Sequence, residues 1–235
     1  MELLLNYAKN YGINLDEKAL ERFENYYNFL VEYNQHTNLT SITEKNDVII
    51  KHFLDSIILT KFLKLNSDTQ LIDVGTGAGF PGVPIKIANP EINLTLLDSL
   101  NKRIIFLNML LEKLNLTAGV FHNRAEECGK NKNFRERFNI VTSRAVAKLT
   151  VLSEYCLPLL KVGGFFVSLK GSNVEDEIEE SAKSIKVLGG KIERVEKFDL
   201  PEGKGSRSLV IIKKVSSTPS KYPRSNSSIA KSPIV

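Results

Sequence analysis

The first 65 residues carry apolar positions at a helical period. Large apolar side chains recur at intervals of three and four residues, at Leu20, Phe23, Tyr27, Leu30 and Val31. This spacing places them on one face of a helix, and Asp16 just before them is a suitable N-cap. A polar stretch at 33–43 interrupts the pattern, and a further helix is expected over 46–63. Residues 1–65 are therefore predicted to form a helical N-terminal extension.

From Leu71 onward, short apolar runs alternate with helical stretches. The runs predict strands at 71–75, 93–98, 118–122, 138–143, 163–169, 194–199 and 207–214. Helices are predicted between them at 81–89, 101–114, 148–160 and 174–188. Such alternation is typical of a parallel sheet with helices on both faces. Only the short turn 201–206 separates the last two strands, so they are expected to pair as an antiparallel hairpin. We predict a Rossmann-like α/β domain over 66–215 with a seven-stranded sheet.

The first predicted strand runs into a glycine-rich turn. Residues 71–79 read Leu-Ile-Asp-Val-Gly-Thr-Gly-Ala-Gly, with glycines at Gly75, Gly77 and Gly79. Glycines let the backbone bend and let a ligand approach bare N–H groups. Asp98 ends the next strand about 20 residues later, where an acid can grip a pair of ribose hydroxyls. A nucleotide-type ligand is therefore expected, with a glycine-rich turn that binds nothing as the alternative.

Two ligand classes fit this loop. The dinucleotide fingerprint G-x-G-x-x-G requires a third glycine where this chain has Phe80. An acid before G-x-G-x-G, as Asp73 is here, is instead the pattern of S-adenosylmethionine (SAM) methyltransferases. SAM carries no phosphate, so its loop needs room for a methionine moiety and a carboxylate facing a cationic end. The sequence favours SAM.

Basic residues follow three of the five parallel strands, at Arg124, Arg144 and Lys170. The carboxyl ends of such strands meet at one crevice, where ligands bind. Glu126 and Ala125, after the third strand, are candidates for the adenine region, although Glu126 also suits the first turn of a helix.

A basic trio at this crevice favours an anionic substrate, with phosphates the obvious candidate. The trio is Arg144, Lys170 and Arg207, the last of which opens the final strand. Each has a structural alternative. Arg144 can pair with an acid of the first two strands, Lys170 can be a solvated lysine, and Arg207 can bridge to an acid of its turn.

The absence of certain residue types after the fourth strand reduces the number of candidate atoms for methylation. The segment 143–146 reads Ser-Arg-Ala-Val, without the Asn or Asp-Pro-Pro-aromatic motif that holds an exocyclic amine. Neither Cys128 nor Cys156 stands where C5-pyrimidine methylation needs its nucleophile. Guanine N7 has a lone pair and no proton, so its methylation needs only orientation and charge balance. The pattern is consistent with N7 methylation.

Charge and composition complete the picture. The net charge is +5 and 42% of residues are hydrophobic, which suffices for a full core. From Lys213 to Val235 there are five basic residues and no acid, so residues 216–235 are predicted to form a flexible basic tail that binds RNA or merely aids solubility. No apolar run approaches the roughly 20 residues of a membrane span, so we expect a cytoplasmic protein without membrane contact. The cysteine spacing predicts no metal site.

These segments together resemble the ribosomal RNA small subunit methyltransferase G family. The resemblance spans nearly the whole chain and is carried by residues 38–40, 52–56, 71–82, 96–103, 124–126, 143–145, 169–171 and 221–224. It implies a class I SAM-dependent methyltransferase that methylates N7 of a guanine in bacterial 16S rRNA, of the guanine-527 type in the small-subunit 530 loop. The implied partner is 16S rRNA or a small-subunit particle, with the enzyme a monomer. The alternatives are a methyltransferase for another RNA, a small molecule or a protein, and an RNA-binding protein with a vestigial SAM fold.

The resemblance also implies roles for individual residues. The cofactor would be held by Gly75, Gly77, Gly79, Phe80, Asp98, Ala125, Glu126 and Arg144. RNA phosphate or the target guanine would be bound by Arg144, Lys170 and Arg207. Asn38, His52 and Asp55 would close over the crevice from the helical extension. No general base is expected.

Overall fold

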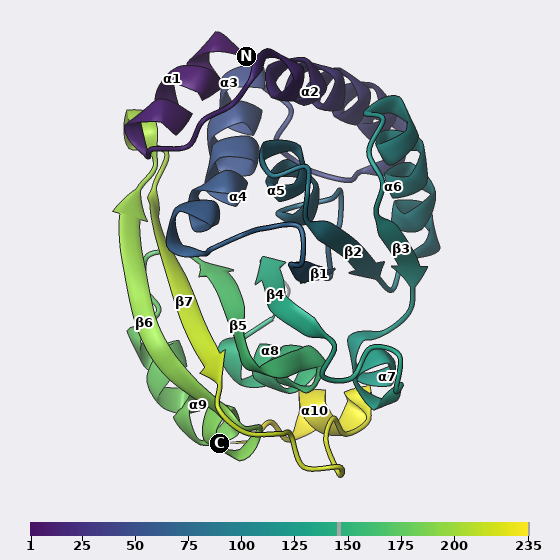
Figure 1. The fold of residues 1–235 in the computed structure, drawn as a ribbon, viewed down its shortest axis with the longest axis vertical. Coiled ribbons are helices and arrows are strands. Elements are labelled where there is room, and N and C mark those ends of the chain that lie inside the picture. The colour runs from purple at the N-terminus through teal and green to yellow at the C-terminus, as the bar shows by residue number, and fades with distance from the viewer. Residues whose placement is uncertain (145–146, 235) are drawn as a thin grey trace.

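The computed structural model describes residues 1–144 and 147–234, which form a mixed sheet between two helical layers (Figure 1). The strands are β1 (Gln70–Val74), β2 (Asn93–Asp98), β3 (Gly119–His122), β4 (Phe138–Arg144), β5 (Leu160–Lys170), β6 (Gly190–Asp199) and β7 (Ser206–Lys214). Their order is β3-β2-β1-β4-β5-β7-β6. The first five strands are parallel, and β7 pairs antiparallel with both β5 and β6. The predicted sheet with its terminal hairpin is confirmed.

Two strands begin earlier than the sequence predicted. β5 starts at Leu160 rather than 163. The sequence did not reveal its first residues, because Gly163, with φ +89°, interrupts the apolar run, and the pairing register with β4 shifts in this region. β6 starts at Gly190 rather than 194. It is an edge strand that pairs only with β7 in the described chain, so charged side chains hide the apolar alternation that would mark it.

Each face of the sheet has its own hydrophobic core. On one face, α5 (Gly82–Ala88) and α6 (Asn101–Lys113) pack together with the N-terminal helices. On the other face lie α7 (Ala125–Lys130), α8 (Leu149–Cys156) and α9 (Glu175–Val187). Short α7 was not predicted, because its six residues carry too few apolar positions for a helical period to show.

The N-terminal layer consists of α1 (Glu2–Asn10), α2 (Glu17–Thr37) and a broken helix from Lys45 to Phe62. Asp16 caps α2 as predicted, since its side chain accepts a hydrogen bond from the Ala19 N–H at 2.7 Å. The broken helix is one predicted helix divided into α3 (Lys45–Val48), a π-helix (Ile49–Leu54), α4 (Asp55–Ile57) and a 3₁₀ turn (Ile58–Phe62). Single π-turns within helices occur frequently at functional sites.

The C-terminal segment, residues 215–234, packs against the α7–α8 side of the molecule (Figure 1). It contains α10 (Asn226–Lys231), and its Tyr222 and Ile229 side chains are buried. The sequence predicted a flexible tail unable to contribute to a core, and the structure differs. Paired charges and carbonyl contacts hold this segment, and an apolar pattern does not reveal them. Within the described ranges, no helix has the length and apolar character needed to span a membrane.

Candidate cofactor and substrate site

A cavity of about 710 Å³ lies at the carboxyl ends of the parallel strands, beneath the N-terminal layer. Most of the predicted site residues line it: Gly75, Gly77, Phe80 and Asp98, with His52, Asp55, Arg144, Lys170 and Arg207. Strands β2, β4, β5 and β7, the glycine loop and the broken helix therefore all line the same cavity. A second cavity, of about 620 Å³, lies near the start of β5 and has none of these residues in its lining.

Asp73 organises the glycine loop. One of its carboxylate oxygens accepts hydrogen bonds from the Thr76 hydroxyl (2.7 Å) and the Gly82 N–H (2.8 Å). Its other oxygen is buried without a hydrogen-bond partner in the described part of the chain. Burial raises the pKa of Asp73 to about 6, and the two hydrogen bonds oppose that rise.

The loop glycines are required by the backbone and by close packing. Gly75, Gly77 and Gly79 all have positive φ, at 70°, 61° and 98°. A Cβ atom on Gly79 would lie 2.7 Å from the hydroxyl of Tyr26, a fully buried residue of α2 that the sequence did not single out. Gly79 therefore supports the loop from behind and is not part of the cavity lining.

Asp98 ties the loop to β2 and lies on the cavity wall. Its carboxylate accepts hydrogen bonds from the Gly77 N–H at 2.9 Å and the Leu100 N–H at 3.0 Å. The Arg103 guanidinium completes this set at 3.1 Å. The predicted ribose acid is thus held by three donors, none of which the sequence pattern revealed.

Ala125 and Glu126 start α7 and do not line the cavity. The loop before them is attached to the wall of the cavity, because the Asn123 N–H donates to the carbonyl of Asp98, which lines the cavity, at 3.1 Å. Glu126 is buried. Ala145, part of the motif that includes Arg144, lies outside the described residues.

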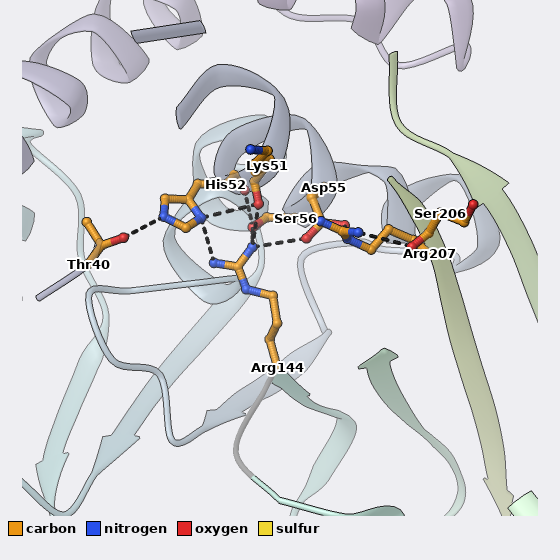
Figure 2. Close-up of polar contacts among 8 residues, drawn as sticks. All are labelled: Thr40, Lys51, His52, Asp55, Ser56, Arg144, Ser206 and Arg207. Atoms are coloured by element: carbon orange, nitrogen blue, oxygen red, sulfur yellow. Dashed lines mark hydrogen bonds and ion pairs between the residues drawn. The ribbon is translucent and has the colours of Figure 1, made fainter. Parts of the chain in front are cut away.

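Arg144 and Arg207 share one carboxylate (Figure 2). Arg144 Nη1 lies 3.2 Å from Asp55 Oδ2, and Arg207 Nε lies 3.3 Å from Asp55 Oδ1. Arg144 Nη1 also donates to the Lys51 carbonyl at 3.2 Å. Arg144 therefore pairs with the helical layer, and the expected alternative of an acid on the first two strands is not what the structure shows. Arg207 likewise reaches beyond its own turn.

His52 is held neutral beside this pair. Burial, followed by the charge of Arg144, lowers the pKa of His52 to about 3. Arg144 Nη2 lies 3.4 Å from His52 Nδ1, and a guanidinium can only donate. Nδ1 also lies 3.2 Å from the Lys51 carbonyl, which can only accept, so these two contacts of Nδ1 require opposite tautomers. Nε2 lies 2.9 Å from the Thr40 hydroxyl, which can either donate or accept. The imidazole stacks on Phe80, with a centroid distance of 4.6 Å.

Lys170 has partners other than solvent. Its ammonium lies 2.7 Å from Glu177 of α9 and donates to the Ala147 carbonyl at 2.8 Å. Glu177 also accepts from the Leu149 N–H. Neither the solvated lysine nor a free cation describes this arrangement, because its charge is already paired.

Two further cations, called the rim lysines here, share one carboxylate next to the cavity. Lys51 and Lys204 lie 2.9 and 2.8 Å from the two oxygens of Asp47. Lys51 lines the cavity, and Lys204 comes from the turn between β6 and β7. The sequence offered no signal for this pair, since its members are about 150 residues apart by residue number. No group of three or more metal-ligating side chains occurs in the described chain.

Comparisons with known proteins agree with this architecture. The family model of rRNA small subunit methyltransferase G matches residues 19–210. The ribosomal RNA small subunit methyltransferase G of Desulforamulus reducens is 50% identical over 97% of this chain and 95% of its own, and that of Bacillus subtilis is 50% identical over 95% and 94%.

Solved structures share the fold at low identity. A SAM-dependent O-methyltransferase from Thermotoga maritima superposes with a TM-score of 0.55 at 14% identity, over 81% of this chain and 72% of its own. Aeropyrum pernix fibrillarin in complex with S-adenosyl-L-methionine gives 0.52 at 12% identity, over 68% and 73%. The sheet order is that of class I SAM-dependent methyltransferases. With the match over most of its length, the chain belongs to the ribosomal RNA small subunit methyltransferase G family.

Proposed function

We propose that this protein transfers a methyl group from S-adenosylmethionine to N7 of a guanine in 16S rRNA, the guanine-527 type of activity. The observation that carries the proposal is a single cavity that combines an acid-anchored glycine loop with a guanidinium pair. Membership of the family supports it. The protein would act as a cytoplasmic monomer on 16S rRNA or a small-subunit particle.

In this proposal the glycine loop holds the methionine half of the cofactor. Gly75, Gly77 and Phe80 line the cavity, and backbone N–H groups there are free of Cβ obstruction at the glycines. The unpartnered buried oxygen of Asp73 supplies negative potential for a cationic ligand. Asp98 would bind the ribose, and Ala125 with Glu126 would border the adenine. When bound, the cofactor supplies a methyl group on a sulfonium centre.

The side chains around Arg144 suit a reaction that requires orientation and no proton transfer. His52, with its pKa near 3, is neutral at physiological pH and its ring nitrogens are already engaged. It is therefore a poor general base and a suitable positioning group. Guanine N7 attacks with its own lone pair, so alignment of the acceptor is the main task of the protein.

The rim provides for RNA. Lys51 and Arg207 line the cavity, and Lys204 contacts the same Asp47 carboxylate as Lys51, so the phosphates of a strand carrying the target base would pass these three cations. Cations position nucleic acid through such phosphates. Asp47 and Asp55 hold these cations in place before RNA arrives.

The decisive experiment maps N7-methylguanosine in 16S rRNA by chemical cleavage, from cells with and without this protein. We expect one cleavage site to disappear without the protein and to return with the wild-type chain. Gly75→Asp should fail to restore it. The control is Gly163→Asp, which alters a positive-φ glycine that lines the second cavity, near the start of β5, and it should restore the cleavage site. Methyl transfer into a metabolite or protein, with none into RNA, would favour the alternative substrate classes.

A further inference from the structure

The guanidinium of Arg135 links the C-terminal segment to α7. Arg135 donates to the Tyr222 and Thr218 carbonyls of the segment, each at 2.7 Å, and to the Gly129 carbonyl of α7 at 2.9 Å. Pro223 packs against the same helix, since a Cβ on Gly129 would lie 2.8 Å from its ring. The far end of α7 is therefore fixed to the last 20 residues of the described chain.

A second clamp joins the segment to α8. Glu154 is 1% exposed, and its carboxylate accepts from the Arg224 backbone N–H at 2.8 Å and from the Arg224 guanidinium at 2.9 and 2.6 Å. Removal of one partner from a buried ion pair leaves an uncompensated charge, which is strongly unfavourable. The segment cannot leave this surface without exposing Glu154 or abandoning it unpaired.

The contacts continue toward Glu126. The Tyr155 hydroxyl of α8 donates to the Asn226 side chain of α10 at 2.6 Å. Burial raises the pKa of Tyr155, and the negative charge of Glu126 raises it further. The segment thus supports α8, which packs beside α7, the helix that begins with Ala125 and Glu126.

At its other end, α7 connects directly to the cavity wall. The loop before it is held by the Asn123 N–H on the Asp98 carbonyl, and by a His122 ring contact of 3.0 Å with the Ser99 carbonyl. Both Asp98 and Ser99 line the cavity. A displacement of α7 is therefore transmitted to the ribose side of the site through one backbone hydrogen bond and one side-chain contact.

Two basic residues at this end of the chain take part in the same set of contacts. Lys214, just before it, is fully buried, donates to the Thr218 hydroxyl at 2.5 Å and lies 3.5 Å from Glu136. Arg224 is paired with Glu154. Lys214 and Arg224 therefore hold the segment in place, whereas Lys221 and Lys231 are exposed.

We propose that residues 215–234 are a positioning element for the adenosine half of the cofactor site, and that the contacts of Arg224 set affinity for S-adenosylmethionine and not for RNA. This rests on the proposed function, because it assigns Ala125 and Glu126 to the adenine. The segment holds α7 and α8 so that those two residues and Asp98 keep one spacing.

The test compares full-length variants of one segment. Arg224→Gln removes the Glu154 partner, and Lys221→Gln makes the same charge change at an exposed position. Calorimetry with SAM should give a dissociation constant at least fivefold higher for Arg224→Gln and unchanged for Lys221→Gln. In turnover assays KM for SAM should rise while kcat at saturating SAM stays near the wild-type value. RNA affinity and its salt dependence should be equal in the two variants.

A milder variant is included because Arg224→Gln could lower SAM affinity simply by misfolding. Asn226→Ala removes only the Tyr155 contact, and it should raise KM for SAM about twofold while circular dichroism stays unchanged. Arg224→Lys, which keeps the charge, should recover part of the lost affinity. Wild-type SAM affinity in both Arg224→Gln and Asn226→Ala, or a selective loss of RNA binding, would overturn the proposal. Absence of SAM binding by the wild-type protein would instead refute the proposed function.

Discussion

The guanidinium of Arg144 lies 3.2 Å from the carboxylate of Asp55, which is 89 residues earlier in the chain. Arg144 ends β4, whereas Asp55 begins α4 in the N-terminal layer. Because Arg207 of β7 shares the same carboxylate, Asp55 connects the helical layer to two separate strands at the cavity. It holds two like charges close together, which would otherwise repel each other.

Asp55→Asn should therefore disorder both guanidinium groups. A misplacement of about 1 Å can cost roughly 100-fold in rate, and we expect kcat to fall by about that factor. SAM affinity should change little, because the side-chain hydrogen bonds that hold the glycine loop come from Asp73 and Asp98 and not from either arginine. Single-turnover methylation of small-subunit particles measures the effect, with Asp68→Asn as an exposed acid outside this cavity. A variant with the wild-type rate would show that the Asp55 bridge is dispensable.

The rim lysines should contribute to RNA affinity through phosphate contacts. Lys51→Gln and Lys204→Gln should each lower the slope of log K against log salt by about 1. Filter binding from low to physiological salt gives the slope. Lys197→Gln, on edge strand β6 and paired with Glu175, is the matched control and should leave it unchanged. If Lys51→Gln and Lys204→Gln kept the same slope as the Lys197→Gln control, Lys51 and Lys204 would not contact RNA phosphates.

Two loop glycines should differ in their tolerance of alanine. Both have positive φ, so Gly77→Ala should cost about 1 kcal/mol of unfolding free energy from the backbone alone. Its Cβ would meet nothing within 4 Å, whereas that of Gly79 would lie 2.7 Å from Tyr26 and 2.9 Å from Val83. Overpacking should add roughly 2 kcal/mol for Gly79→Ala. Urea denaturation compares the two variants, and equal losses would contradict the packing argument.

Asp73 should make cofactor affinity depend on pH. Its pKa of about 6 in the folded protein exceeds the usual 3.8, so the folded state binds a proton more tightly than the unfolded state. The free energy of unfolding from this group therefore falls as pH rises from about 4 to 6. A cationic ligand prefers the ionised form, so SAM affinity should rise about tenfold between pH 5 and 7.

Calorimetry across this range measures the dependence, and Asp73→Asn should bind SAM more weakly at pH 7 with a flat profile. The variant also separates the two effects, because its unfolding free energy should lose the fall between pH 4 and 6. A flat profile in the wild-type protein would mean that the free oxygen of Asp73 does not face the bound cation.

Local patterns in the sequence determined the strands, their alternation with helices, the glycine loop with Asp73 and Asp98, and the family. These depend on short-range rules: apolar periodicity, positive-φ glycines, and an acid at a strand end. The N-terminal helices were also predicted, except that the break around His52 and Asp55 was not, because π and 3₁₀ turns leave no distinct period.

Only the tertiary structure decided which charges meet. The Arg144–Asp55–Arg207 cluster, the Lys51–Asp47–Lys204 rim and the Arg224–Glu154 clamp each join residues far apart in the chain. A charged residue gives no local signal of its partner, since Coulomb attraction depends on distance in space and on burial, not on sequence separation. For the same reason a C-terminal segment that reads as a disordered basic tail is held by buried pairs.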